Sequence, residues 1–182
     1  MVNDLISEDI KANRDRYLAI MHDHGTKSPD AIIDSVRETQ HELFEIYSSV
    51  SEEAARHKPA AGEWSIYDLA LHTVFTERLI AKLIHHMARS SVPPAEDLEG
   101  AGIGMMPKDN HQGYYDILDD LRRTNTDLLE AVRDLPGEPD TVMKVPHPYF
   151  GELNCLEWAG FQRVHDLDHI QHARKILAAI PV

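Results

Sequence analysis

The chain has 182 residues, a length that suits a single domain of ordinary size. Hydrophobic residues make up 42% of it and charged residues 27%, which excludes a disordered or membrane-embedded composition. The formal net charge of -13 repels phosphate backbones and argues against a nucleic-acid partner. Cys155 is the only cysteine, so neither an intrachain disulfide nor a cysteine-based zinc site is expected.

The first residues are polar, and the sequence has no apolar run of about 18 residues. Both features argue against a signal peptide and an ordinary transmembrane helix. We therefore expect a cytoplasmic protein with no membrane partner. Histidine is unusually frequent, with 12 residues.

Apolar residues repeat at a spacing of three and four in four long stretches, which is typical of amphipathic helices. An additional N-terminal helix is expected from about Asp4 to Met21, followed by a flexible polar turn at residues 22–25. We therefore divide the chain into a helical extension at residues 1–27 and a bundle domain at residues 28–182. The four long helices are expected at about Pro29 to Val50, Ser65 to Ala88, Gln112 to Leu135 and Cys155 to Ala179.

Ser28, Ser65 and Asn154 are predicted N-caps, and the last two begin capping boxes. Four helices of this length bury their apolar faces most simply in a four-helix bundle, so the predicted fold class is all-α. Two long connections, at residues 90–111 and 135–154, favour either crossovers or caps over one end of the bundle. Within the second, residues 141–145 favour a short strand.

Three histidines form the main candidate site. His165 and His169 stand four residues apart, so both imidazoles lie on one helix face, and His72 lies on the predicted buried half of another helix. Three neutral imidazoles with open positions left over are typical of a catalytic transition-metal site. Asp166 and Asp168 could orient an imidazole through its second nitrogen. The alternative is that these histidines are solvated surface residues of a histidine-rich chain.

Other candidates carry weaker patterns. His147 lies between two prolines and could reach the site from above, although an exposed loop histidine is the simpler interpretation. Cys155 begins a predicted helix and is interpreted as packed rather than reactive. Glu77 stands five residues after His72 and therefore off its face, so no role is assigned to it. Glu38 and His41 make a single ExxH pair, whereas a di-iron bundle needs two.

Three segments resemble motifs of the DinB-like metal-binding proteins, and they occur in the family's order. The segments are GEWSIYDLALH at residues 62–72, PHPYFGELN at residues 146–154, and the stretch at residues 157–172 that contains EW and HDLDHIQH. The resemblance covers roughly residues 28–178. It implies an up-down-down-up four-helix bundle, commonly dimeric, that binds a divalent metal ion, nickel or zinc.

By position, the resemblance implies that His72, His165 and His169 are the metal ligands. His172 departs from the pattern, because many members carry glutamine there, and it could support or compete with the ligands. The resemblance assigns no catalytic residue.

Some members of this family transfer low-molecular-weight thiols such as bacillithiol or mycothiol to electrophiles, or isomerise maleylpyruvate with such a thiol. The resemblance therefore implies a thiol-dependent S-transferase, or a related metal-dependent enzyme such as a hydrolase, that acts on a small electrophile. The alternative is a non-catalytic, stress-related dimeric module that binds a metal or a small molecule.

Two further expectations concern assembly and charge. Apolar residues off the main stripes favour a homodimer; they are Ile33, Phe44, Ile46 and Ile84. The acidic background is expected to raise the pKa values of the histidines.

Overall fold

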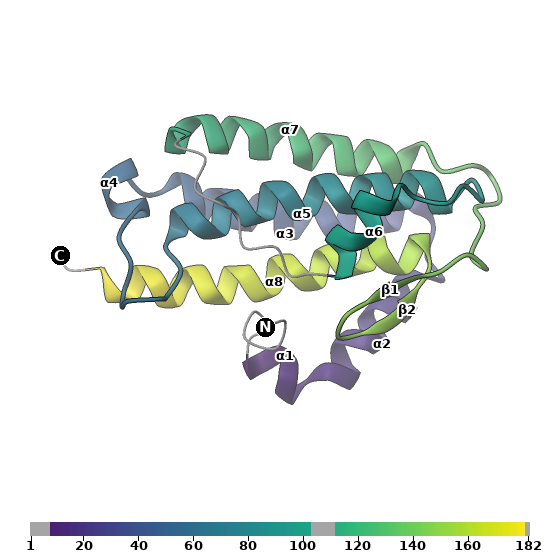
Figure 1. The fold of residues 1–182 in the computed structure, drawn as a ribbon, viewed down its shortest axis with the longest axis horizontal. Helices are drawn as coiled ribbons and strands as arrows, with labels where there is room; N and C mark the ends of the chain where they lie inside the picture. Colours follow the sequence, from purple (N-terminus) through teal and green to yellow (C-terminus); the bar gives the residue numbers. More distant parts are fainter. Residues whose placement is uncertain (1–7, 103–111, 181–182) are drawn as a thin grey trace.

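The structure is a computed structural model that describes residues 8–102 and 112–180, which are mostly helical (Figure 1). The helices are α1 (Glu8–Ala12), α2 (Arg14–His24), α3 (Pro29–Ser48), α4 (Glu52–Ala55), α5 (Ile66–Met87), α6 (Ala95–Gly102), α7 (Tyr114–Arg133) and α8 (Cys155–Ala179). Two short strands, β1 (Val145–His147) and β2 (Gly151–Leu153), precede α8. None of the helices in the described ranges has the length and apolar character to cross a membrane.

The four long helices α3, α5, α7 and α8 form the expected bundle. Helix α8 packs against α3 and α5, and α7 packs against the same two helices. Helices α3 and α8 run in one direction while α5 and α7 run in the other (Figure 1). The all-α fold and the up-down-down-up topology are therefore confirmed.

The two long connections have different roles in this topology. Because α5 and α7 are parallel neighbours, their connection is a crossover, and its described part contains α6, which packs against α5 and β1. The connection between α7 and α8 instead stays at one end of the bundle, where β1 and β2 form a hairpin (Figure 1).

The predicted caps start three of the long helices. The Ser28 hydroxyl accepts a hydrogen bond from the backbone N–H of Ala31. Ser65 and Asp68 form one capping box, and Asn154 and Glu157 form another. Each cap satisfies backbone donors that would otherwise lack a partner, which stabilises a helix by about 1 kcal/mol. These caps fix where α5 and α8, the two helices with the candidate ligands, begin.

The N-terminal helix differs from its prediction. It is interrupted at Asn13 and continues to His24, while residues 4–7 lie outside the described residues. His24 is buried; its Nδ1 donates to the carbonyl of Ile20 at 2.8 Å, and its Nε2 accepts from the Ser35 hydroxyl at 2.9 Å. The flexible polar turn was therefore wrong, because His24 is held inside the fold.

The strand lies slightly later than expected. The Asp140 carboxylate accepts hydrogen bonds from the backbone N–H groups of Val142 and Met143, which turns the chain there. Strand β1 then begins at Val145 and pairs antiparallel with β2. Gly151 has a φ of 86°, a value that favours glycine at the tight return of this hairpin.

Helix α2 contributes to the main core through Tyr17 and Met21, both of which are buried. The boundary between the N-terminal extension and the bundle domain at residue 27 stays a prediction.

Two of the four residues proposed for a dimer, Ile33 and Ile84, are core residues. The Arg122 guanidinium covers the ring of Phe44 at 4.6 Å. The four residues therefore do not form a common exposed face.

Candidate metal centre

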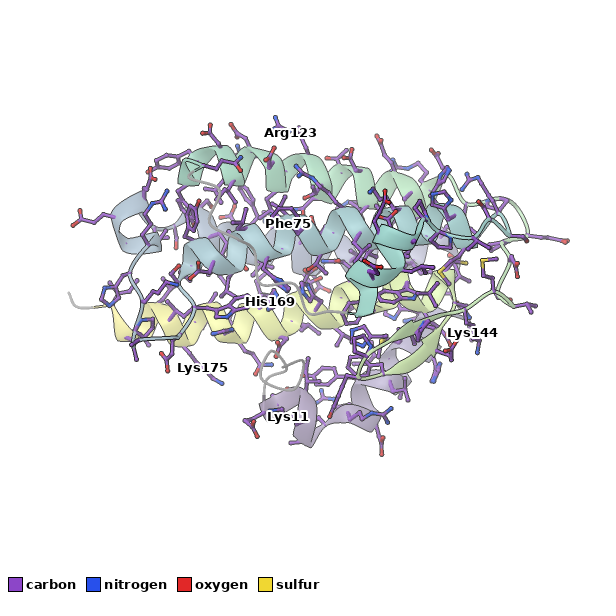
Figure 2. All side chains as sticks on the ribbon, viewed as in Figure 1. Lys11, Phe75, Arg123, Lys144, His169 and Lys175 are labelled. Atoms are coloured by element: carbon purple, nitrogen blue, oxygen red, sulfur yellow. The ribbon has the colours of Figure 1, made fainter. Side chains whose placement is uncertain are left out.

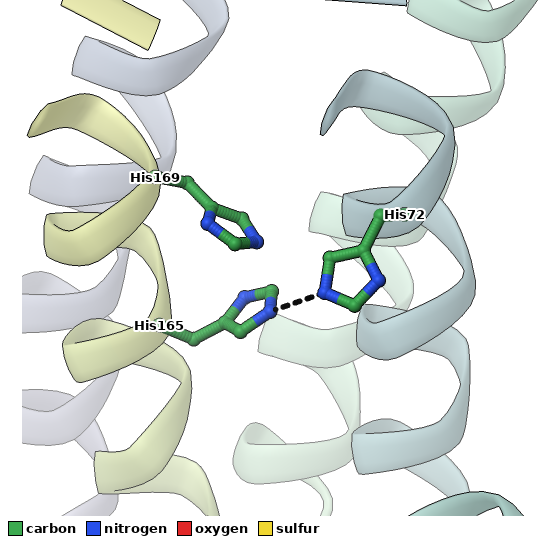
Figure 3. A group of neighbouring side chains, drawn as sticks. All are labelled: His72, His165 and His169. Atoms are coloured by element: carbon green, nitrogen blue, oxygen red, sulfur yellow. Dashed lines mark hydrogen bonds between the residues drawn. The ribbon is translucent and has the colours of Figure 1, made fainter. Parts of the chain in front are cut away.

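The structure brings His72, His165 and His169 together between α5 and α8 (Figure 3). One ring nitrogen from each residue lies within 4.8 Å of the other two. The side chain of His169 is labelled in Figure 2, where α8 faces α5. All three residues are buried, with exposed fractions of 8%, 8% and 5%. They are therefore not solvated surface histidines.

The nitrogen positions suit a shared metal ion. The Nε2 atoms of His72 and His165 lie 3.1 Å apart. Two nitrogens about 2.0–2.1 Å from a zinc ion, at angles between square and tetrahedral, would lie about 3 Å apart. Nδ1 of His165 and both ring nitrogens of His169 are buried, and none has a hydrogen-bond partner among the described residues. Buried polar atoms normally have partners, so these atoms have the properties expected of a site that a ligand completes.

Burial determines the charge state of the two histidines on α8. It lowers the pKa values of His165 and His169 well below their ordinary value, and the neighbouring imidazoles lower both pKa values further. The expectation that the acidic background raises histidine pKa values was wrong for these two, because desolvation outweighs distant, screened charges. Both rings are therefore neutral, which is the form that binds metal ions.

The neighbouring carboxylates do not orient the imidazoles by direct hydrogen bonds. An oxygen of Asp168 lies 3.9 Å from Nδ1 of His169, which exceeds hydrogen-bond distance. Asp166 instead accepts hydrogen bonds from Thr39 at 3.0 Å and Gln162 at 2.7 Å. The orienting role expected of Asp166 was therefore wrong.

Aromatic rings surround the histidine cluster. The Trp64 ring lies edge-on to His72 at 5.1 Å and also approaches His172 at 6.1 Å. On the other side, the Phe161 ring lies 5.7 Å from His165. Among the described residues, His172 does not join the group of nitrogens within 4.8 Å, so it flanks the cluster beside Trp64.

A buried acidic network that the sequence analysis missed lies beside the cluster. Glu77 is fully buried and accepts hydrogen bonds from Gln40, Thr124 and Gln162. The amide of Gln162 also donates to Asp166, so it bridges the two carboxyl groups. Burial raises the pKa values of both, and for Glu77 the nearby Asp166 adds to the rise.

The position of Glu77 was readable from the sequence. Glu77 is four residues after Thr73 and three before Ile80, two members of the apolar stripe of α5, so it lies on the buried face. Its five-residue separation from His72 concealed this placement.

His147 and Cys155 also have defined environments. His147 belongs to β1, and its ring centroid lies 4.5 Å from that of Phe161. The interpretation of His147 as an exposed loop residue was therefore wrong. Cys155 is buried, and its thiol donates to the carbonyl of Asp140 at 3.4 Å. Burial raises the pKa of Cys155 to about 11, which is consistent with a packed thiol.

The fold and the cluster define a helical bundle protein with a three-histidine candidate metal centre. A family model of the DinB superfamily matches residues 35–173, and the chain belongs to this superfamily. It is 22% identical to the uncharacterized protein YuaE of Bacillus subtilis (strain 168), over 76% of this chain and 93% of YuaE.

Two solved structures share the fold. The four-helix bundle protein TT2238 matches with a TM-score of 0.60 and 20% identity, over 81% of this chain and 99% of that one. The mycothiol-dependent maleylpyruvate isomerase matches with a TM-score of 0.61 and 13% identity. That match covers 86% of this chain and 62% of the isomerase.

Proposed function

We propose that the chain binds one divalent transition-metal ion, nickel or zinc, through His72, His165 and His169. The observation that carries the proposal is the convergence of three buried imidazoles whose ring nitrogens lie within 4.8 Å of one another. Neutral imidazole is a preferred ligand of both metals, and nitrogen atoms without partners are what such an ion would satisfy.

We further propose that this centre serves a metal-dependent thiol transfer to a small electrophile. When bound, a divalent ion supplies Lewis acidity that lowers the pKa of a thiol or of a water molecule placed on its open side. Support comes from the superfamily, from the mycothiol-dependent isomerase that shares the fold, and from the residues of the site. Among the described residues, no further histidine, cysteine or carboxylate joins the three ligands.

The residues around the three ligands would prepare the site in two ways. Burial keeps His165 and His169 neutral, so their nitrogens are available without first losing a proton. Trp64 and Phe161 pack against the imidazoles and limit the rotation of their rings. Rigid and neutral ligands reduce the cost of ordering the site when an ion binds.

Metal analysis of the purified protein tests the first proposal. We expect one equivalent of bound metal in the wild type and its loss in His72→Ala, His165→Ala and His169→Ala, because each removes one of three protein ligands. His172→Ala is the matched control, since it removes a neighbouring histidine on α8 and is expected to keep the metal. One equivalent of metal in any of the three ligand variants would contradict the assignment.

A thiol screen tests the second proposal. The metal-loaded protein is incubated with mycothiol, bacillithiol or glutathione and a fluorogenic haloalkyl bimane, and thioether formation is followed. We expect acceleration by the wild type and none by His165→Ala. A protein that binds the metal but accelerates thioether formation with none of these thiols would instead support the non-catalytic binding module.

We also propose that the protein acts in the cytoplasm, as expected from its sequence.

A further inference from the structure

We propose that His147 is a hydrogen-bond donor that positions the ligand of the metal centre, with Nε2–H directed to an oxygen of that ligand. The inference rests on the proposed function. It assigns to the β1–β2 hairpin a part in recognising small molecules that carry a carbonyl or carboxylate oxygen.

The hairpin determines which nitrogen of His147 carries the hydrogen. Nδ1 accepts hydrogen bonds from the backbone N–H groups of Tyr149 at 3.1 Å and Phe150 at 3.2 Å. A nitrogen that faces two donors must present its lone pair, so the neutral imidazole carries its hydrogen on Nε2. Burial lowers the pKa of His147 to about 4, so the ring stays in this neutral form near pH 7.

Aromatic packing links the ring to the candidate metal centre through Phe161. His147 lies 4.5 Å from Phe161, 5.5 Å from Trp158 and 5.0 Å from Phe150, measured between ring centroids. Phe161 stands one helical turn before His165 and also contacts the His165 ring, so one phenyl ring touches both imidazoles.

The donor at Nε2 is not used by the fold. In the described part of the chain, the hydrogen bonds of His147 are those to Nδ1, and no residue accepts one from Nε2. The residue is half-buried, so the ring is held by its neighbours without being sealed off. A ligand that accepts a hydrogen bond from this donor binds more favourably because the side chain is already held in place and loses little conformational entropy on binding.

Two amide variants separate the two nitrogens. In His147→Asn, Oδ1 stands as many bonds from the backbone as Nδ1 and can accept from Tyr149 and Phe150, but the distal donor is lost. In His147→Gln, the side-chain amide provides the distal donor and the acceptor for the hairpin is lost. If His147 only supports the fold, His147→Asn leaves the choice between ligands unchanged, whereas the loss of a ligand-positioning histidine changes that choice.

The test uses the Co²⁺-loaded protein and two thiols of similar size, mercaptopropionate and propanethiol, followed by the thiolate-to-cobalt charge-transfer absorption. Mercaptopropionate offers a carboxylate oxygen to Nε2–H and propanethiol does not. For His147→Asn we expect a melting temperature lowered by the loss of ring packing, wild-type affinities for Co²⁺ and propanethiol, and mercaptopropionate binding weakened by about three- to tenfold. For His147→Gln we expect a lower melting temperature but a preference for mercaptopropionate closer to that of the wild type.

The ratio of the two thiol dissociation constants is compared within each variant, so a change in stability alone does not move it. With the ratio taken as the Kd of propanethiol divided by the Kd of mercaptopropionate, a wild-type ratio in His147→Asn, or a smaller ratio in His147→Gln than in His147→Asn, would overturn the inference and leave the metal assignment standing. A wild type that binds no Co²⁺ would overturn the proposed function and the inference with it.

Discussion

Gly160 on α8 lies directly against His24 at the end of α2. A Cβ atom at Gly160 would lie 2.7 Å from Cβ of His24 and 3.2 Å from Cα of Met21. Real side chains do not approach so closely, so only glycine allows α2 to pack this near to α8. The position of the N-terminal segment thus depends on a missing side chain in the helix that carries His165 and His169.

Replacing this glycine tests the contact. We expect Gly160→Ala to lower the free energy of unfolding by about 1–3 kcal/mol, because the added methyl group forces α2 away from α8. Urea unfolding followed by circular dichroism measures the change. Gly137→Ala is the matched control, since a Cβ at Gly137 would meet nothing within 4 Å. Equal free energies of unfolding for the two variants would show that α2 can move away from α8 without loss of stability.

The low pKa values of His165 and His169 predict how metal binding responds to acid. At these two ligands, protons compete with the ion only below the folded pKa values, which burial places well under the ordinary value of about 6.5. We therefore expect the increase in melting temperature caused by Zn²⁺ to be similar at about pH 7.5 and pH 6, and to decrease as the pH falls further through the folded pKa values.

Thermal melts with and without Zn²⁺ at each pH measure this effect, and His72→Ala provides the baseline for ions bound elsewhere. A Zn²⁺-induced shift that has already disappeared near pH 6 would indicate exposed, easily protonated ligands and would contradict the buried site.

The acidic pair predicts a second pH dependence in the metal-free protein. The pKa of Glu77 is raised by burial and by Asp166, so the folded state keeps a proton that the unfolded state releases. Stability from this proton is fully present below the unfolded pKa of about 4.5 and is lost as the pH rises through the folded pKa. We expect Glu77→Gln, which has no such proton, to gain stability relative to the wild type between about pH 5 and pH 8.

Urea unfolding at the two pH values measures the difference. Glu45→Gln on the exposed face of α3 is the control and should change little with pH. If the wild type and Glu77→Gln have parallel profiles of stability against pH, the pKa of Glu77 is not raised in the folded state.

The expected homodimer also remains to be measured. Of the apolar residues that suggested it, Phe44 and Ile46 on α3 are the two that stay half-buried. We expect light scattering at micromolar concentration to give twice the monomer mass. A monomer mass would contradict the dimer and leave the metal site unaffected.

The sequence allowed the bundle and the pairing of two histidines on one helix face to be predicted because both depend on local spacing. The caps at Ser65 and Asn154 and the four-residue interval between His165 and His169 are properties of single helices. The role of Asp166 required knowledge of which helices are neighbours. Consecutive residues on a helix point about 100° apart, so Asp166 contacts Thr39 on α3 while His165 turns to α5.

His147 was missed for a similar reason. Its environment comes from Phe161 and Trp158, which lie on a different element, and the prolines around it suggested only an irregular loop. The short hairpin was displaced in the prediction because the turn at Asp140 depends on side-chain hydrogen bonds that periodicity does not reveal.

The distribution of the three histidines over α5 and α8 sets an order of events during synthesis. Domains fold as units while the chain emerges from its N-terminal end. His72 is made early, but its two partners belong to the last helix of the bundle, 93 or more residues later. A nascent chain therefore has no complete binding site until α8 has been made and has packed between α3 and α5. At the proposed three-histidine site, acquisition of the ion would follow folding, because unfinished chains lack two of the three histidines.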